Sequence, residues 1–463
     1  MSLVESIYAR LPVPLQNVCA TLQGWSYVRK RYRGTFPAHV DALMRSQWCT
    51  AEQYRTFQNQ ELRRLLQEAY DHVPWHQRAL SKQASLLHGM EVKDLPDLPF
   101  MEKADVRGST DQFINKSRLK YGYKEGHTSG TSGHPFIWPY DYLSGRHNLA
   151  FRERQYYWAG ISHHHRSARF SGRILLGKHE RVPYWRHNAA ENQWLFSTYH
   201  ITEESLPQYY DVLRQLNFRF LDGYPSALFQ IAQWVNRQGL SGTFRPWAII
   251  TTAETLMDFQ RAEIQEAFQC KVYNFYSSSE GAPFVTQCEA GRMHLNPESG
   301  IIEFIRPDGS YADPGEEAEI VVTSFFQRTL PLIRYRIGDV ATLSLNQECP
   351  CGRHMPVIDS IGGRESDVVF TKQRGRIGSA GLSTALYKIP HRMKQSQLEQ
   401  TAEDRFVFRY VPAGEPLNEA EKKIVLNALH DRLGSEVMIS IVEVNAIPCG
   451  ARGKTRLVIG LKR

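Results

Sequence analysis

The sequence lacks any run of about 18 apolar residues, so it contains no segment with the composition of a membrane-spanning helix. It also lacks a basic N-terminal segment followed by an apolar core, which is the pattern of a secretory signal. Its seven cysteines are mostly scattered singly, and disulfides are rare where no secretory signal directs export. Internal repeats and low-complexity segments are missing too. These absences favour a globular, cytoplasmic protein without disulfides.

The length of 463 residues is too great for one core, so at least two domains are expected. Hydrophobic residues make up 42% and charged residues 22% of the chain, as in ordinary globular proteins. The net charge of +8 favours an anionic partner such as a nucleotide, CoA, a membrane surface or nucleic acid. It does not choose among them, and solubility explains the charge equally well.

Hydrophobic periodicity predicts alternating helices and short buried strands in the first three quarters of the chain. Helices are expected over 206–216 and 226–237, strands over 218–221, 247–251, 272–276, 301–305 and 318–323, a helix ending near residues 73–74, and an extended segment over 94–107. This alternation is typical of an α/β fold with parallel strand pairing.

The pattern changes after residue 363. A hairpin is expected over 368–378, strands over 406–411, 437–444 and 456–461, and a charged helix over 419–433. We therefore predict a large multi-sheet α/β N-terminal domain over 1–363 and a small, mobile α+β C-terminal domain over 364–463.

Small hydroxylated residues alternate with glycines in one segment that is poor material for a core. It reads Thr128, Ser129, Gly130, Thr131, Ser132, Gly133, His134 and Pro135. Glycines let backbone N–H groups approach an anion closely, and hydroxyls add donors, which suits a polyphosphate. No Gly-Lys-Ser/Thr follows at the distance that a Walker A loop requires. A disordered Ser/Gly linker is the alternative.

Four further motifs follow in order: Tyr276–Glu280, Tyr335–Asp339, Gly363–Asp367 and Gly453–Arg456. In the first, an aromatic ring could stack on a purine and a carboxylate could hold Mg²⁺. In the second, an Asp after a Gly turn at a strand end could accept two ribose hydroxyl protons. The third lies at the expected domain junction. In the fourth, a lysine on a Gly-rich turn could reach charge developing on phosphate.

Taken together and in this order, the five motifs resemble those of the adenylate-forming superfamily of acyl-CoA synthetases and adenylation domains. Within it the chain is most similar to the phenylacetate-CoA ligase group and its CapK-like branch. Residues 98–105, 223–226 and 349–353 carry that finer resemblance. The resemblance covers nearly the whole chain.

The resemblance implies a two-step reaction in which a carboxylate attacks ATP to give acyl-AMP and pyrophosphate, and a nucleophile then displaces AMP. It implies catalytic roles for Lys454 and for Glu280, the latter through Mg²⁺. The implied ATP- and AMP-binding residues are Thr128, Ser129, Gly130, Thr131, Ser132, Gly133, Ala253, Glu254, Phe275, Tyr276, Ser279, Asp339 and Arg364. A domain rotation about Ser366 and Asp367 would separate the two steps. The acceptor is CoA or an amine.

Two departures from the family pattern stand in the chain. Many relatives carry a lysine directly after the loop proline, where this sequence has Phe136. The hinge aspartate of many relatives falls two residues after the arginine, where this chain has Ser366, and Asp367 is one residue further on. The phosphate contacts and the hinge position are the features that these departures affect.

Cys288, His294, Cys349 and Cys351 offer three thiolates and one imidazole, which suits a closed, structural zinc site. The two pairs are expected on loops that flank one face of the same domain. The spacing is not that of a standard zinc finger, and buried thiols beside a hydrogen-bonded histidine are the alternative. The run His163–His165 could also bind metal, although a solvated loop explains it better.

The acyl pocket is expected among Tyr224, Pro225, Ser226, Gly281 and Ala282. The aromatic rings of Tyr224 and Phe275 favour an aryl or medium-sized apolar acid.

Segment 7–35 combines apolar residues with a basic cluster and could rest on an anionic membrane face, although a helix packed on the main domain explains it too. A zinc-containing nucleic-acid-binding protein and a catalytically dead scaffold remain as alternatives. The first leaves the five motifs unexplained. The second conflicts with the retention of Lys454, Glu280 and Asp339. Nucleic acid is therefore not expected as a partner, and the sequence does not predict the oligomeric state.

Overall fold

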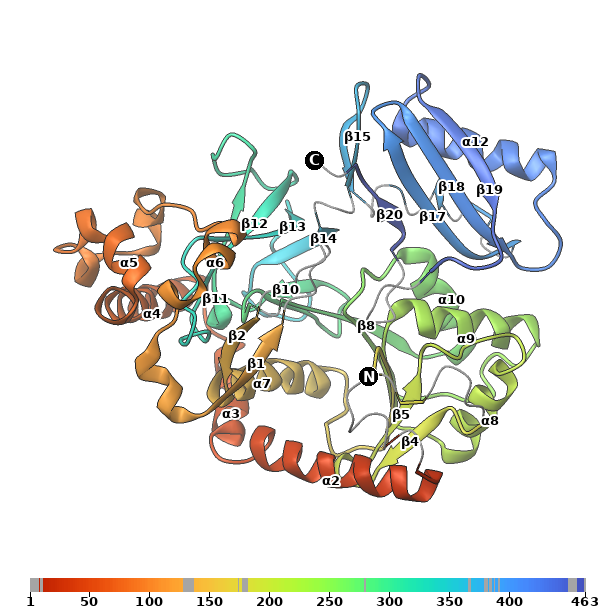
Figure 1. Ribbon diagram of the computed structural model, residues 1–463, viewed down its shortest axis with the longest axis horizontal. Helices are drawn as coiled ribbons and strands as arrows, with labels where there is room; N and C mark the ends of the chain where they lie inside the picture. Colours follow the sequence, from red (N-terminus) through yellow and green to blue (C-terminus); the bar gives the residue numbers. More distant parts are fainter. Residues whose placement is uncertain are drawn as a thin grey trace. The chain divides into compact units, whose positions relative to one another are not determined.

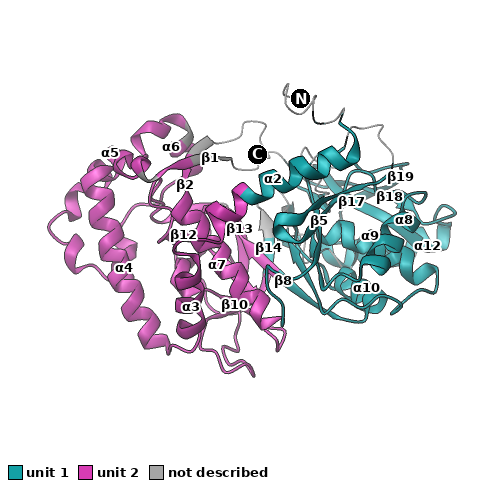
Figure 2. Ribbon diagram, turned by 90° about the horizontal axis from the view of Figure 1, so that it is seen from below, with its two compact units in different colours: residues 1–25, 160–274, 361–463 teal, residues 26–159, 275–360 magenta. Residues whose placement is uncertain are grey.

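The computed structural model describes residues 8, 11–127, 137–173, 175–176, 182–278, 280–364, 368–378, 382, 385–386, 388–389, 392–448 and 456–461. The chain forms two compact units, which are coloured separately in Figure 2. Unit 1 comprises residues 1–25, 160–274 and 361–463, and unit 2 comprises residues 26–159 and 275–360. Each unit is therefore built from segments that lie far apart in the sequence.

Unit 1 contains a mostly parallel sheet with the strand order β7-β6-β3-β5-β4. Its strands are β3 (Ser167–Ser171), β4 (Trp185–Asn188), β5 (Gln193–Ser197), β6 (Phe220–Gly223) and β7 (Ala248–Thr252). Strands β5, β3, β6 and β7 pair in parallel, and β4 joins β5 antiparallel. The associated helices are α8 (Leu206–Leu216), α9 (Pro225–Arg237), α10 (Asp258–Phe268) and the short η6 (Ala189–Glu191). Helices thus connect parallel strands, as in other α/β folds.

The C-terminal part of unit 1 carries a second sheet with the order β19-β18-β17-β20 (Figure 1). Its elements are β17 (Met393–Ala402), β18 (Arg405–Pro412), α12 (Glu419–Leu433), β19 (Met438–Glu443) and β20 (Val458–Ile459), preceded by the hairpin β15 (Val368–Thr371) and β16 (Gly375–Gly378). Asn418 caps α12 by accepting the backbone N–H of Glu421 at 2.9 Å. Val425, Leu429 and Leu433, spaced four residues apart on that helix, are buried.

Within unit 1 this C-terminal part contacts the parallel-sheet part. Lys394 Nζ lies 3.0 Å from Glu203 Oε1, and Gln233 Nε2 donates to the backbone oxygen of Met393 at 3.4 Å. The domain boundary at residue 364 stays a prediction.

Unit 2 contains the strand order β11-β12-β13-β14-β10-β9-β8. Its strands are β8 (Lys271–Ser277), β9 (Phe284–Gln287), β10 (Met293–Leu295), β11 (Gly300–Ile305), β12 (Glu317–Ser324), β13 (Tyr335–Leu343) and β14 (Val357–Arg364), with a separate pair β1 (Tyr123–His127) and β2 (Ile137–Asp141). Strands β8 and β14 have residues in both units.

Several helices complete unit 2. They are α3 (Phe36–Ser46), α4 (Ala51–His72), α5 (Pro74–Ala79), α6 (Lys103–Gly108) and α7 (Tyr142–Trp158), with the short η1 (Ser81–Gln83), η2 (Leu87–Gly89), η3 (Val92–Asp97), η4 (Thr110–Gln112), η5 (Lys116–Tyr121) and η7 (Pro297–Ser299). Helix α2 (Val13–Arg31) begins in unit 1 and ends in unit 2.

The predicted α/β class is confirmed, and most predicted elements fall within two residues of their observed bounds. The prediction of an extended segment over 94–107 is wrong, because η3 and α6 occupy most of that range. Both are nucleated by local capping. The Asp94 carboxylate accepts the N–H of Glu91 at 2.9 Å, and the Asp105 carboxylate accepts the N–H of Glu102 at 3.0 Å.

The second correction concerns Tyr335–Asp339, which was predicted to follow a strand but lies inside β13. Strand β12 pairs with β13 at Tyr335 and Arg336 and again from Val340 onward, and the register shifts between Glu319 and Val321. Gly338 adopts a φ of +79° at this irregularity, a conformation that glycine tolerates best. A bulge therefore replaces the expected strand-end turn.

A buried histidine in unit 2 predicts how stability depends on pH. His76 is fully buried, its Nε2 lies 2.9 Å from the carbonyl oxygen of Pro331, and burial lowers its pKa to about 4. In the unfolded chain a histidine protonates near pH 6.5. The unfolded state therefore gains a proton first, and stability is lost as the pH falls from about 6.5 to 4.

This effect amounts to about 1.4 kcal/mol per pH unit in that window. His76→Gln retains an N–H donor for Pro331 and should flatten the pH dependence of the urea midpoint between pH 7 and 5. The exposed His88→Gln should leave that dependence unchanged. Equal slopes for wild type and His76→Gln would contradict the assignment.

Candidate active site and metal centre

Two of the predicted nucleotide-binding motifs meet in unit 2. Tyr276 lies near the end of β8 and Asp339 lies in β13, 63 residues further along the chain. The Tyr276 hydroxyl donates a hydrogen bond to the Asp339 carboxylate, and both side chains are half-buried. The phenol therefore holds the carboxylate in one orientation beside an aromatic ring.

The turn between β8 and β9 positions Glu280. The strands pair through Phe275 opposite Thr286 and Ser277 opposite Phe284, so the connection between them is short. Ser278 strengthens it, because its hydroxyl donates to the carbonyl oxygen of Ala282. Glu280 lies in this turn and is half-buried.

Gly281 adopts a φ of +84°, and a Cβ atom there would lie 3.1 Å from the Ser324 hydroxyl. The turn therefore requires glycine at this position both for its backbone conformation and for space. Ala282 and Phe275 are buried beside it. Of the predicted residues in this motif, Ser279 lies outside the described part of the chain.

The remaining predicted pocket residues lie in unit 1, after strands β6 and β7. Tyr224 is buried and precedes α9, whose first residue is Pro225. The Glu254 carboxylate accepts the backbone N–H of Ser226 at 3.0 Å, and Ala253 adopts a φ of +71°. Glu254 thus satisfies an N–H group at the positive end of a helix. Sequence reasoning assigned Glu254 to ATP and AMP binding and missed this contact.

Thr128–Gly133, the hinge residues Ser366 and Asp367, and Lys454 lie outside the described residues. Arg364 is the last residue of β14.

The structure brings the predicted metal ligands together in unit 2. Cys288 follows β9, His294 lies in β10, and Cys349 and Cys351 lie on the connection from β13 to β14. Because β10 pairs with both β9 and β14, these segments converge. The three sulfur atoms and one imidazole nitrogen all lie within 4.8 Å of one another.

The distances fit a tetrahedral ion. Cys288 Sγ lies 3.6 Å from Cys349 Sγ, and Cys351 Sγ lies 3.4 Å from His294 Nε2. Zinc bonds of about 2.3 Å to sulfur and about 2.0 Å to nitrogen place tetrahedral ligands roughly 3.5 to 3.8 Å apart. His294 Nδ1 donates to the carbonyl oxygen of Met355 at 3.1 Å, which leaves Nε2 as the ligand atom.

The thiols differ in their surroundings. Burial raises the pKa of Cys288 to about 12 and also raises that of Cys349. Burial acts in the same direction on Cys351, but hydrogen bonds from Arg353 and Cys349 outweigh it and lower the pKa of Cys351. Thiols bind a metal only as thiolates, so a bound cation would offset the negative charge that burial disfavours.

Arg353 links the loop that carries Cys349 and Cys351 to the loop that carries Cys288. Its guanidinium lies 2.8 Å from the carboxylate of Glu289, the residue after Cys288. Its Nε donates at 3.0 Å to Gln47 Oε1, which also accepts the indole N–H of Trp158 at 2.8 Å. Such outer contacts orient metal ligands.

The His163–His165 run belongs to no cluster of potential metal ligands within the described residues. His165 Nδ1 instead accepts the backbone N–H of Ser162 at 3.0 Å. The solvated-loop interpretation is favoured.

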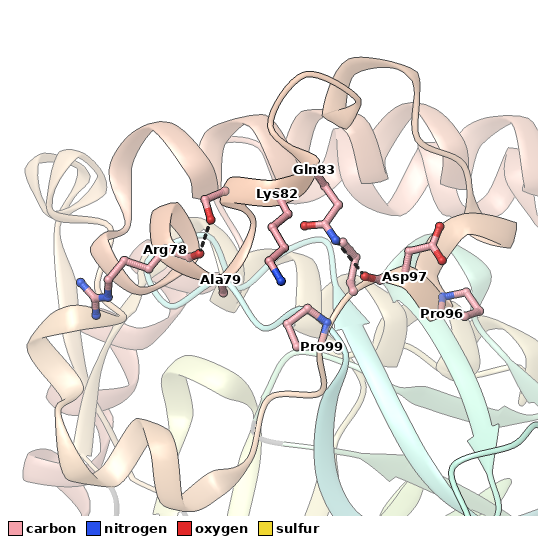
Figure 3. Close-up of a pocket in the computed structure, with 9 residues that line it drawn as sticks. Arg78, Ala79, Lys82, Gln83, Pro96, Asp97 and Pro99 are labelled. Atoms are coloured by element: carbon pink, nitrogen blue, oxygen red, sulfur yellow. Dashed lines mark hydrogen bonds between the residues drawn. The ribbon is translucent and has the colours of Figure 1, made fainter.

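A separate pocket of about 410 Å³ lies between α5–η1 and the segment around η3 in unit 2 (Figure 3). Arg78 from α5, Lys82 from η1 and Asp97 from η3 are among the residues that line it. None of the predicted site residues lines this pocket, so we assign it no part in catalysis.

Comparison with known proteins identifies related chains. Residues 369–460 match the CapK C-terminal domain. Protein CapK of Staphylococcus aureus is 27% identical over 464 residues, covering 99% of both chains. The phenylacetate-coenzyme A ligase of Thermus thermophilus is 21% identical over 449 residues, covering 89% of this chain and 97% of that protein.

Among solved structures, 2-hydroxyisobutyryl-CoA ligase in its postadenylation state with an acyl-AMP has a TM-score of 0.71. The likeness covers 90% of this chain and 92% of that one at 18% identity. At this identity the likeness shows a shared fold.

Proposed function

We propose that the chain is a CapK-like member of the adenylate-forming superfamily and an ATP-dependent ligase that activates a carboxylic acid as acyl-AMP. It resembles Protein CapK along 99% of its length, and its residues 369–460 match the CapK C-terminal domain. Pyrophosphate leaves in the first step, and the acyl group passes to a thiol, that of CoA, in the second. The hydrogen bond from Tyr276 to Asp339 carries the proposal, because it joins two nucleotide motifs in a fold shared with an acyl-CoA ligase.

In the first step one anion attacks another, so cationic groups must stabilise the reacting phosphate more strongly in the transition state than in the ground state. Lys454 is the proposed source, reaching the substrate carboxylate and the α-phosphate. Glu280 offers the carboxylate oxygens that Mg²⁺ prefers, from a turn fixed by Gly281. The ion, when bound, would neutralise phosphate charge. Residues 128–133 would hold the β- and γ-phosphates through backbone N–H groups and hydroxyls.

The nucleoside would be held by Asp339 and Arg364 at the ribose and by Tyr276, Ala253 and Glu254 near the adenine. The hydrogen bond from Tyr276 orients the Asp339 carboxylate for two ribose hydroxyls.

Tyr276→Phe removes that hydrogen bond and retains the ring. We expect the KM for ATP to rise about fivefold with little change in kcat, since the net value of one such bond is about 1 kcal/mol. The matched control is Tyr311→Phe, which removes another tyrosine–carboxylate bond, 2.8 Å long, to Glu303. If both variants raise the KM equally, or neither does, the ribose role fails.

The cysteine centre is proposed as a structural zinc site with four protein ligands, Cys288, His294, Cys349 and Cys351. Its ligand set is complete without water, whereas catalytic zinc retains an open position. Bound zinc would therefore cross-link the β9–β10 turn and the β13–β14 connection.

The acyl pocket is proposed among Tyr224, Pro225, Ser226, Gly281 and Ala282, with an aryl or medium-sized apolar acid as substrate. Pyrophosphate release with Mg²⁺-ATP should be measured across aryl, fatty and amino acids without an acceptor. Release with one acid class would establish adenylation and identify the acyl group. CoA and amines, including amino sugars, are then tested as acceptors of that acyl group. Failure of ATP binding in folded protein would refute the proposal.

A further inference from the structure

The part of helix α2 that belongs to unit 1 uses its polar residues to contact the rest of that unit. Asn17 Oδ1 accepts the backbone N–H of His187 at 2.9 Å, and Thr21 Oγ1 accepts that of Ala189 at 3.2 Å. Gln16 accepts a hydrogen bond from the buried Arg186 side chain. These contacts place the polar side of the first three turns against the end of β4, beside which α2 lies in Figure 1.

Gly24 extends this contact by one more turn. It is buried, and a Cβ atom there would lie 2.1 Å from the side-chain oxygen of Asn188. The helix can approach β4 so closely because this position has no side chain. The orientation of α2 is therefore fixed over residues 16–24.

The apolar residues of α2 are on the opposite side and face solvent. Leu15, Val18, Leu22 and Trp25 are spaced three or four residues apart, which places them on one stripe of the helix. Their exposed fractions run from 49% at Leu15 to 65% at Leu22. A helix that packs on a protein ordinarily buries such a stripe. Here the polarity is reversed, and a contiguous exposed apolar stripe marks an interaction surface.

The charged residues that follow this stripe along the chain are all basic. Arg29 continues the same helical stripe, and Lys30, Arg31 and Arg33 follow. Residues 6–40 contain five Lys and Arg residues and no Asp or Glu. A surface that combines exposed Leu, Val and Trp with a run of basic residues complements a surface that is apolar within and anionic outside.

We propose that α2 binds the surface of an anionic lipid bilayer, with Leu15, Val18, Leu22 and Trp25 inserted at the boundary between headgroups and acyl chains. Tryptophan prefers this boundary, and the basic cluster would contact lipid phosphates. Within the described residues no helix has the length and apolarity needed to cross a bilayer, so the contact is peripheral. The proposal is independent of the ligase activity.

The test is co-sedimentation of the full-length chain with vesicles of phosphatidylcholine alone and with 30% phosphatidylglycerol added. We expect binding to the anionic vesicles that weakens in high salt. Leu22→Ser combined with Trp25→Ser should weaken it at least about tenfold, since each inserted side chain contributes apolar area. Both residues are exposed, so the fold should be retained.

The matched control is Leu86→Ser combined with Leu345→Ser, which removes two exposed leucines elsewhere and should leave vesicle binding intact. Equal binding by the stripe variant and wild type would overturn the proposal, as would failure of wild type to sediment with anionic vesicles. A wild-type dimer that the stripe variant converts to monomer, without vesicle binding, would assign the stripe to a second copy of the chain instead.

Discussion

Lys454→Ala is expected to lower carboxylate-dependent pyrophosphate release by about 10²–10³-fold, the loss typical of removing one group that stabilises transition-state charge. The reason is electrostatic. The attacking carboxylate and the α-phosphate repel each other, and negative charge builds on the leaving pyrophosphate as its bond to the α-phosphorus breaks. A cation that acts only at this point lowers the barrier without tightening substrate binding, so kcat should fall more than KM rises.

The same variant should retain the second half-reaction. When AMP is displaced from acyl-AMP, no anion attacks a phosphate. The variant should therefore convert preformed acyl-AMP and CoA to thioester at a rate close to that of wild type. The control is Lys423→Ala, which removes an exposed lysine from α12. Equal loss of both half-reactions would show that Lys454 supports the fold or general binding rather than adenylation.

Local sequence signals predicted much of the fold. The helices over 206–216 and 419–433 have the expected bounds, because periodic apolar residues and caps such as Asn418 are encoded within the element. The segment 94–107 was missed because its prolines suggested extended backbone, whereas aspartates three residues after Glu91 and Glu102 close capped turns. The bulge at Gly338 depends on pairing with β12, which the motif alone does not encode.

In the candidate site, too, local sequence signals were predictable and contacts between distant segments were not. Ligand chemistry in the sequence identified the four residues of the cysteine centre, but their convergence depends on β10 lying between β9 and β14. The contact of Glu254 with the start of α9 was not predictable, because it joins residues 28 positions apart across two strand ends. The sequence left open which way the apolar residues of α2 face, because periodicity shows that a stripe exists and not its direction.

Removing one ligand of the cysteine centre should affect metal content and stability together. Cys351→Ser is expected to lower the bound zinc from one per chain and to destabilise unit 2 by several kcal/mol, because the binding free energy of a structural ion is folding free energy. His294 Nε2, which faces Cys351 Sγ at 3.4 Å, would lose its partner in a buried site. Zinc content by mass spectrometry and the thermal midpoint measure the two effects.

Cys49→Ser is the matched control, because Cys49 packs in the same apolar cluster and is not one of the four ligands. It should retain zinc and lose little stability. The folded Cys351→Ser variant should still release pyrophosphate at low temperature, since a site with four protein ligands offers no position for substrate. A metal-free wild type would exclude the zinc site, and a loss of activity that precedes any loss of stability would assign the ion a catalytic role instead.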